Sequence, residues 1–393
     1  MFANSAYWAG AGTVVAALMD YYGMPLWLTN LIAGFTSTLP VLQMAGSGMY
    51  QRTTHPARMT RGLSVAWRAM LPVCFFSVLL PMPLGAAVAP LAYLTALVLN
   101  QLVGPAMNDW MVNSLNRKIS SDYYALRETA FMVMVTVSSC AVNLSLSWGQ
   151  KQNTMRLAFL FCAVFLSVSL ACSVPPLFRI DPPRPMPRTA RISPRKALAD
   201  RIFRPVLAAG VLWSFAGMFL GSYATTYQIQ VLHLPFETIL LWSVAGNLLR
   251  ALCTPLMNRA AERIGWKYVC FGCMGLVSAT GVLWLLMTEN TLWLLFPACC
   301  LINAVAYAGL GVGMFKLQLE HMPSAAQGVY FAANAACTGI AACLGSVLCS
   351  ATISGFGRLG WALNLIFAIG LVLSVGAALL VRRVPDPASR SAA

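Results

Sequence analysis

Apolar segments long enough to cross a membrane as helices follow one another along almost the whole of this chain of 393 residues. Hydrophobic residues make up 59% of the chain and charged residues only 9%, whereas about 25% of an average soluble domain is charged. Only helices of about 20 residues and closed barrels satisfy their backbone hydrogen bonds in hydrocarbon. The segments lack the alternation of a barrel strand, so we expect an all-α, polytopic membrane protein.

One long stretch, residues 175–204, interrupts this pattern with seven prolines and eight Lys or Arg residues. Proline fixes φ and lacks an N–H group, and charges are costly in hydrocarbon. The stretch is therefore predicted to stop the preceding helix and to form an aqueous linker on the cytoplasmic side. It divides the chain into an N-terminal six-helix bundle (1–174), the linker (175–204), a C-terminal six-helix bundle (205–381) and a cytoplasmic tail (382–393).

Twelve transmembrane helices are predicted, six in each half, with short turns alternating with longer basic loops. They cover roughly residues 2–20, 27–48, 64–83, 86–107, 128–147, 155–174, 205–226, 237–257, 268–287, 291–315, 328–350 and 360–381.

The net charge of +15 raises the question of nucleic-acid binding, but the positions of the basic residues favour another explanation. With the N-terminus in the cytoplasm, 21 of the 26 Lys and Arg residues lie on cytoplasmic segments. The positive-inside rule therefore predicts a multi-pass protein of the cell (inner) membrane with both termini in the cytoplasm, and no nucleic-acid partner. The first span begins almost at Met1 without a cleavage pattern, so we expect it to stay as a membrane anchor.

The twelve cysteines are scattered through apolar segments, where Cys behaves as a small hydrophobic residue. Cys270 and Cys273 have the spacing of half a zinc or redox site, but no second pair or nearby histidine completes it. We therefore expect no metal and no cofactor.

A loop motif joins the six-plus-six pattern in indicating a family. Residues 258–267, NRAAERIGWK, are similar to the cytoplasmic signature of the major facilitator superfamily, which has a glycine, an acid followed by arginine, then glycine and a basic pair. Glu262 stands where the family has Asp, whereas Asn258 and Trp266 depart from its glycine and first basic residue. The corresponding loop at 48–58 keeps the basic character but has no acid. The resemblance covers nearly the whole chain.

Two further stretches, 110–127 and 221–230, resemble an uncharacterised bacterial branch of the superfamily. The resemblance implies two six-helix bundles that rock about each other and move a small organic solute by alternating access, with proton coupling as one way to drive the transport. Internal duplication of a membrane domain independently favours a secondary transporter. A facilitative uniporter and a drug-efflux carrier are the alternatives within this class.

Functions outside transport have less support in the sequence. A membrane enzyme would need convergent catalytic groups, but the three histidines lie far apart in loops, and no phosphate-binding Gly-rich motif is present. Long soluble tails would favour a non-transporting sensor, whereas the stretch after Arg383 is short and polar. We therefore expect a monomer that is not an enzyme, whose partners are a small-molecule substrate, the lipid bilayer and, if transport is coupled, protons.

In this superfamily the first and fourth spans of each half line the central cavity, so the resemblance directs attention to the polar residues of spans 1, 4, 7 and 10. Charges and amides in other spans join them because they are costly in a membrane without a partner or a function. Each can bind a polar solute or join two helices. The substrate-path candidates are Asn4, Trp8, Asn100, Gln101, Asn143, Tyr223, Tyr227, Gln230, Asn247, Arg250, Asn303, Tyr307 and Asn334.

Arg250 is the strongest of these candidates because it lies several residues before the end of span 8. Three interpretations stay open: an ion-paired or snorkelling arginine that locks the bundle, a group that binds an anion, and a gate. Arg68, near the end of span 3, is expected to snorkel. Gly309, Gly311 and Gly313 in span 10 indicate close helix packing or a bend.

Charged residues near the span ends are candidates for gating and coupling. Opposite charges at the inner ends of spans 8 and 9 can tie these helices together in one state and separate in the other. The central cavity is expected to hold no carboxylate, so Asp20 is the first candidate for proton coupling. The candidates are Asp20, Arg127, Glu128, Arg259, Glu262, Arg263 and Lys267.

Overall fold

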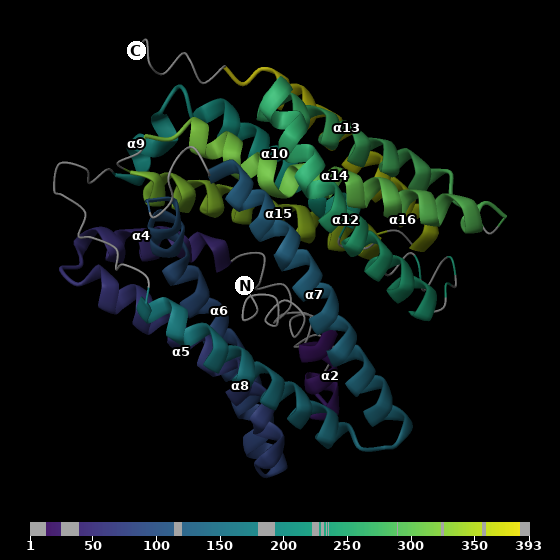
Figure 1. Cartoon of the computed structure of the whole chain (residues 1–393). Helices are drawn as coiled ribbons and strands as arrows, with labels where there is room; N and C mark the ends of the chain where they lie inside the picture. Colours follow the sequence, from purple (N-terminus) through teal and green to yellow (C-terminus); the bar gives the residue numbers. More distant parts are fainter. Residues whose placement is uncertain are drawn as a thin grey trace. The chain divides into compact units, whose positions relative to one another are not determined.

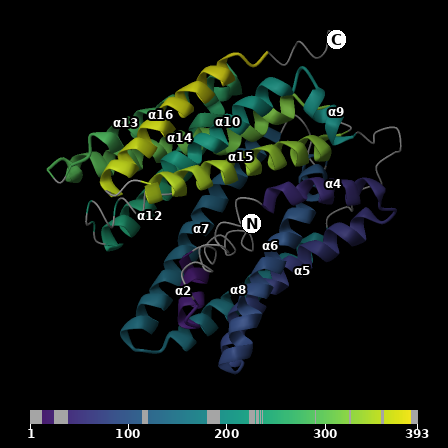
Figure 2. The same cartoon turned by 180° about the vertical axis from the view of Figure 1, so that it is seen from behind.

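The computed structural model describes residues 13–24, 39–113, 120–179, 193–221, 236–288, 290–323, 326–355 and 359–385, together with Gln228, Leu232 and Leu234. Every regular element in these ranges is a helix (Figures 1 and 2), which confirms the all-α prediction.

Nine helices in the described ranges are long and apolar enough to cross a membrane. They are α5 (Pro56–Phe76) continued by η2 (Ser77–Leu79), α6 (Met82–Asn113), α7 (Ser120–Lys151), α8 (Met155–Arg179), α10 (Arg204–Gly221), α13 (Trp266–Leu285), α14 (Leu292–Glu320), α15 (Gln327–Gly355) and α16 (Leu359–Arg382).

Three predicted spans are not among these nine. The first two lie largely outside the described residues, which include only α2 (Thr13–Tyr21), η1 (Leu39–Leu42) and α4 (Gln43–Arg52) from that part of the chain. The eighth coincides with α12 (Phe236–Ile264), whose arginines and asparagines lower its hydropathy. The count of twelve therefore stays a prediction.

The linker begins later than the sequence indicated. Helix α8 continues through Pro175 and Pro176 to Arg179, so these prolines do not stop it. The fixed φ of proline is compatible with a helix, but each proline leaves the carbonyl four residues before it without its usual donor, so these two prolines weaken α8 without ending it. A short helix, α9 (Pro194–Ala199), lies within the predicted linker, and α10 starts at its last residue, Arg204.

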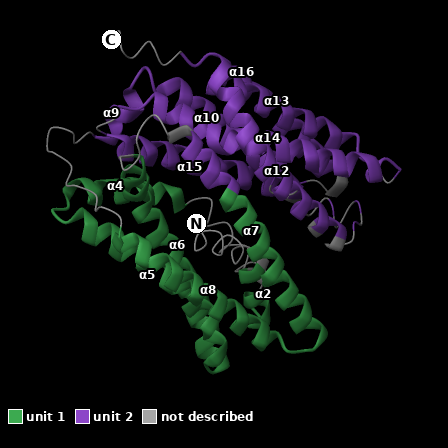
Figure 3. Ribbon diagram, viewed as in Figure 1, with its two compact units in different colours: residues 1–116, 130–191 green, residues 117–129, 192–393 purple. Residues whose placement is uncertain are grey.

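The chain forms two compact units (Figure 3). Unit 1 contains residues 1–116 and 130–191, and unit 2 contains residues 117–129 and 192–393. One division falls near residue 192, within the predicted linker. The other passes through α7, whose residues 120–129 belong to unit 2 while the rest of the helix belongs to unit 1.

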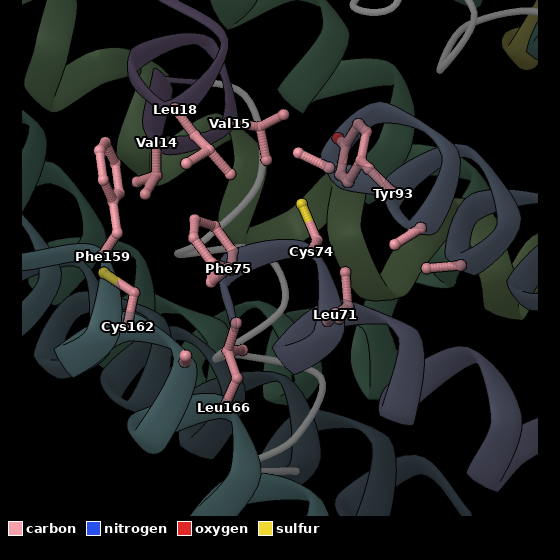
Figure 4. Close-up of a cluster of buried hydrophobic side chains, with 14 of the residues drawn as sticks. Val14, Val15, Leu18, Leu71, Cys74, Phe75, Tyr93, Phe159, Cys162 and Leu166 are labelled. Atoms are coloured by element: carbon pink, nitrogen blue, oxygen red, sulfur yellow. The ribbon is translucent and has the colours of Figure 1, made fainter. Parts of the chain in front are cut away.

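In unit 1, α5 packs between α6 and α8, and α4 packs against α6. The core is held by interlocking apolar and aromatic side chains, and the rings of Phe75 and Phe159 stack with their centroids 6.4 Å apart. Figure 4 shows Val14, Val15, Leu18, Leu71, Cys74, Phe75, Tyr93, Phe159, Cys162 and Leu166 in this cluster. Close packing of side chains gives the unit its cohesion, because lipid tails are as apolar as these side chains and burial from water contributes little between membrane helices.

Unit 2 repeats this packing order. Helix α13 packs between α14 and α16, and α12 packs against α14, while α10 contacts α15 and α16. In terms of the predicted spans, the third span of each half packs between the fourth and the sixth, and the second packs on the fourth. Trp284 stacks on Phe367 at 5.7 Å in the core of the unit. This shared order is what an internal duplication produces.

His321 fixes the end of α16 in unit 2. Its ring is 1% exposed, with Nδ1 2.7 Å from the carbonyl oxygen of Leu317 and Nε2 2.8 Å from that of Pro385. Its role in the described structure is therefore to join the segment after α16 to the end of α14.

Candidate functional site

A cavity of about 310 Å³ lies within unit 2, lined by residues of α10, α12, α13 and α14 and by Gln228. Its volume is at the lower end of the range of small-molecule sites. Four of the predicted substrate-path residues line it: Asn247, Arg250, Asn303 and Tyr307. The structure thus brings together candidates from two spans that are well separated in the sequence.

Helical spacing explains why these four side chains share one space. Asn247 and Arg250 are three residues apart on α12, and Asn303 and Tyr307 are four residues apart on α14, so each pair lies on one helix face. The Arg250 guanidinium lies over the Tyr307 ring, 5.9 Å from its centroid. The Thr280 hydroxyl of α13 donates a hydrogen bond of 3.2 Å to Asn303 Oδ1. The wall therefore combines a cation, amides, hydroxyls and aromatic rings.

Arg250 is ion-paired, as one of its three interpretations required. Its Nη2 donates to Oε1 of Glu128 at 2.5 Å, and the side chains are 22% and 13% exposed. Glu128 lies in the part of α7 that belongs to unit 2, where Thr129 Oγ1 also donates to the Ala251 carbonyl at 3.3 Å. A carboxylate thus bonds directly to a residue of the cavity wall, although Glu128 itself is not among the lining residues.

Gly311 of α14 makes room for this ion pair. A Cβ atom at this position would lie 2.7 Å from Arg250 Nη2 and 2.9 Å from Glu128 Oε1, closer than real Cβ contacts. Gly309 and Gly313 similarly face the sulfur atoms of Cys273 and Cys270, which are buried. Helix α14 runs without interruption from Leu292 to Glu320. Close packing is therefore the role of these three glycines in this structure.

The motif at the end of α12 is tied to α7 by a residue that departs from the family signature. Nδ2 of Asn258 donates to Asp122 Oδ1 at 3.1 Å and to Glu262 Oε1 at 3.2 Å. Gly265 has φ of +87° at the start of α13, a conformation that favours glycine. Trp266, in place of the first basic residue, is buried beside Gly313. The segment thus has a defined architecture in which Asn258 links two acids.

The other gating candidates occupy different surroundings. Glu262 and Lys267 line a second cavity of about 320 Å³ with Glu320 and His321. Lys267 Nζ is 5.7 Å from the centre of the Tyr268 ring.

The remaining charged residues of this group lie away from the first cavity. The Arg127 guanidinium lies 5.7 Å from the centre of the Tyr124 ring. Arg259 and Arg263 are exposed near the end of α12, and Asp20 is exposed near the end of α2. Arg68 Nη1 donates to the Ser64 carbonyl at 2.8 Å, so its side chain points toward the start of α5.

Several substrate-path candidates do not line the cavity. Gln101 Oε1 accepts a hydrogen bond of 2.8 Å from Gln43 Nε2 and so joins α6 to α4. Asn334 Oδ1 lies beside Gly210 of α10. Asn100 and Asn143 are half-buried on α6 and α7. The remaining candidates fall outside the described residues: Asn4, Trp8, Tyr223, Tyr227 and Gln230.

The cavity also contains residues that sequence reasoning missed. Gln228, Thr280 and Trp242 line it. The i, i+4, i+7 spacing of Tyr223, Tyr227 and Gln230 would put these candidates on one helix face, which excludes Gln228. Thr280 is on the ninth span, which the resemblance did not highlight. Their polarity was the available signal, but helical periodicity alone gave no reason to select them.

Comparison with known proteins shows which family and which solved structures share this architecture. The family model described as Major Facilitator Superfamily matches residues 123–346, more than half of the chain. No curated protein matches the sequence.

Two solved structures illustrate the likeness of fold. A bacterial homologue of the iron transporter ferroportin, in its outward-facing state, has a TM-score of 0.71 at 14% identity, over 98% of this chain and 96% of that chain. A Major Facilitator Superfamily transporter, FucP, in the outward conformation, has a TM-score of 0.66 at 11% identity, over 98% of both chains. At these identities the likeness concerns the fold.

Proposed function

Because this chain belongs to the Major Facilitator Superfamily, a family of multi-pass membrane transporters, we propose that it is a secondary transporter of a small, polar organic solute. The observation that carries this proposal is the cavity in unit 2, where Arg250 and three other polar candidates meet. Amides, hydroxyls and aromatic rings suit an organic molecule with several hydrogen-bonding groups. The fold supports the transport class, and the cavity supports the kind of solute.

The Arg250–Glu128 pair is our candidate for the gate of this transporter. It joins α12 to residues 120–129 of α7, while the rest of α7 belongs to unit 1. Breaking the pair would remove the ionic contact between the start of α7 and α12 and leave the weaker hydrogen bonds of Thr129 and Asn258, so the pair can form in one state of an alternating-access cycle and separate in the other. A polar cavity makes its separation less costly than it would be in lipid.

Glu128 is also our first candidate for proton coupling, ahead of Asp20. Protonation of the Glu128 carboxylate would remove the charge that holds Arg250 and so favour the separated state. Asp20 is exposed near the end of α2 and is not among the lining residues. A facilitative uniporter would bind the same solute, but its transport would not depend on protonation of Glu128. The orientation proposed from the basic residues places both termini in the cytoplasm of the cell, and the transporter in the inner membrane.

Transport into proteoliposomes tests the proposal. The purified protein is reconstituted and screened with labelled sugars, sugar acids, amino acids and organic cations, with and without an imposed pH gradient. We expect uptake of at least one polar solute, strongly reduced by Arg250→Ala and retained by Arg204→Ala, which removes an exposed arginine at the start of α10 in the same unit. Uptake of none of these solutes by well-folded protein would contradict the proposal.

Two substitutions separate the coupled carrier from the uniporter. In a proton-coupled carrier, Glu128→Gln abolishes the stimulation of uptake by the pH gradient, while Asp20→Asn leaves it unchanged. The reverse result would return the coupling role to Asp20. Wild-type uptake that does not respond to the gradient would identify a uniporter.

A further inference from the structure

Two buried polar atoms at the cavity of unit 2 have no hydrogen-bond partner among the described residues. They are Nε of Arg250, which is a donor, and Oε1 of Gln228, which is an acceptor. Gln228 is 8% exposed. Buried polar groups in folded proteins are nearly always paired, and an unpaired one is costly. Both atoms are covered in this structure, so a ligand would reach them only after a small movement of the two side chains, and it would then have to offer both an acceptor and a donor.

Arg250 retains binding capacity after its contact with Glu128. A guanidinium has five N–H donors in one plane, and the ion pair uses Nη2. The other N–H groups lie in the same plane, and the Arg250 side chain is 22% exposed and lines the cavity, so an oxygen of a second anion can bind to it there. A carboxylate has two oxygens in one plane that match the planar guanidinium. Its hydrogen bonds to the guanidinium are also about twice as strong as those of a neutral oxygen.

We propose that the substrate of this cavity is a small hydroxylated organic anion, whose carboxylate binds Arg250 and whose hydroxyl group donates to Gln228. This inference rests on the proposed function and specifies its substrate class. Asn247 and Asn303 supply further amides for hydroxyl groups, and Trp242 supplies an aromatic wall.

The charge of the wall distinguishes this class from its competitors. An organic cation would be repelled by the Arg250 guanidinium. The Tyr307 ring, whose face could attract a cation, is already occupied by this guanidinium, 5.9 Å from the ring centre. A neutral sugar would bind Arg250 without charge assistance. Glu128, in turn, repels a second carboxylate and so weakens the binding of the anion. Removing the Glu128 charge should therefore strengthen binding of an anion and leave binding of a matched neutral molecule unchanged.

Binding to the purified full-length protein in detergent tests the inference without requiring transport. The probes are pairs that differ in charge but little in shape: gluconate with sorbitol, and lactate with lactamide. Thermal shifts rank the probes, because a ligand of the folded state raises its apparent stability, and calorimetry gives the dissociation constants. We expect at least one acid to bind at least about tenfold more tightly than its neutral counterpart.

Three variants identify the residues responsible. Arg250→Gln should weaken binding of the acid by at least about tenfold, and Glu128→Gln should strengthen it several-fold. Arg204→Gln, which changes an exposed arginine at the start of α10 in the same unit, should leave it unchanged. If Arg250→Gln does not fold, Gln228→Leu provides a neutral alternative and should weaken binding about fivefold or more, the loss of one hydrogen bond.

The result that overturns the inference differs from the result that overturns the proposed function. If no acid binds, if sorbitol and lactamide bind as tightly as the acids, or if the cavity variants leave binding of the acid unchanged, the substrate class is wrong, even when proteoliposomes transport another solute. If an acid binds through Arg250 but no solute is transported, the substrate class stands and the transport function fails.

Discussion

The α4–α6 pair of unit 1 and the α12–α14 pair of unit 2 occupy equivalent places in the packing order, but they use their polar residues differently. In unit 1, Gln43 bonds to Gln101, and the Tyr50 hydroxyl donates to Asp109 at 2.9 Å. Each of these bonds joins one helix to the other. Tyr50 and Asp109 are 4% and 6% exposed. The polar groups of this pair are therefore used for cohesion.

In unit 2, the polar residues of α12 and α14 line a cavity instead of pairing across the helix interface. Asn247 and Arg250 face it from α12, and Asn303 and Tyr307 face it from α14. The charge of Arg250 is balanced from a third helix, α7. A duplicated arrangement can thus keep its packing while one copy changes from cohesion to binding.

The largest effect is expected when the Arg250–Glu128 pair loses one member. Arg250→Gln or Glu128→Gln alone leaves one charge without its partner, and loss of one partner of a buried pair costs up to about 3–5 kcal/mol. The double change Glu128→Gln with Arg250→Gln should recover most of this stability, because it leaves no lone charge. The apparent melting temperature of the purified protein measures both effects.

The control for this prediction is Arg259→Ala, which removes an exposed arginine of the same helix and should change stability by less than about 0.5 kcal/mol. If the double variant loses the full sum of the two single effects, the pair contributes no coupling and the comparison of the two units loses its main contrast.

Gly311→Ala should produce the next largest effect. Its added methyl group meets both Arg250 and Glu128, and overpacking of this kind costs about 1–3 kcal/mol. Gly275→Ala on α13 is the matched control: its methyl group would meet nothing within 4 Å, and alanine favours a helix by up to about 1 kcal/mol. Thermal unfolding of the two variants should therefore shift in opposite directions. Equal shifts would mean that Gly311 does not accommodate the pair.

Hydropathy and helical spacing predicted much of the fold and half of the candidate site. Apolar length predicted the helices, polarity made Asn247, Arg250, Asn303 and Tyr307 candidates, and the spacing within each pair is that of one helix face. Side-chain direction on a single helix depends on local geometry, which the sequence specifies. These are the parts of the site that a single chain segment determines.

The contacts between distant segments could not be predicted in this way. Glu128 lies 122 positions from Arg250, and no periodic pattern relates the two. The continuation of α8 to Arg179 could not be predicted from Pro175 and Pro176, because proline has a φ compatible with a helix and weakens a helix without always ending it. Asn258 was noted as a departure from the family signature, but only the approach of Asp122 shows what its amide does.

Tyr50→Phe tests the cohesive role of unit 1 at an intermediate scale. Asp109 would lose a buried donor, which costs about 1–3 kcal/mol, while the affinity for the transported solute should stay unchanged. Asn247→Ala in unit 2 should show the opposite result, with lower affinity and little loss of stability. Melting curves and calorimetric titration of the two variants compare these roles directly. A change of affinity in Tyr50→Phe would show that both units bind the solute.

The smallest effect is expected for the Gln43–Gln101 bond. A double-mutant cycle with Gln43→Leu and Gln101→Leu should give a coupling energy of about 0.6 kcal/mol, the average for side-chain hydrogen bonds between membrane helices. Such bonds are weak because the unfolded chain in the membrane also finds partners for its amides. Binding affinity should stay at the wild-type value in all three variants. A coupling energy above about 2 kcal/mol, beyond the range of such bonds, would indicate that Gln101 belongs to a larger polar network, and the contrast between a cohesive unit 1 and a binding unit 2 would then have to be redrawn.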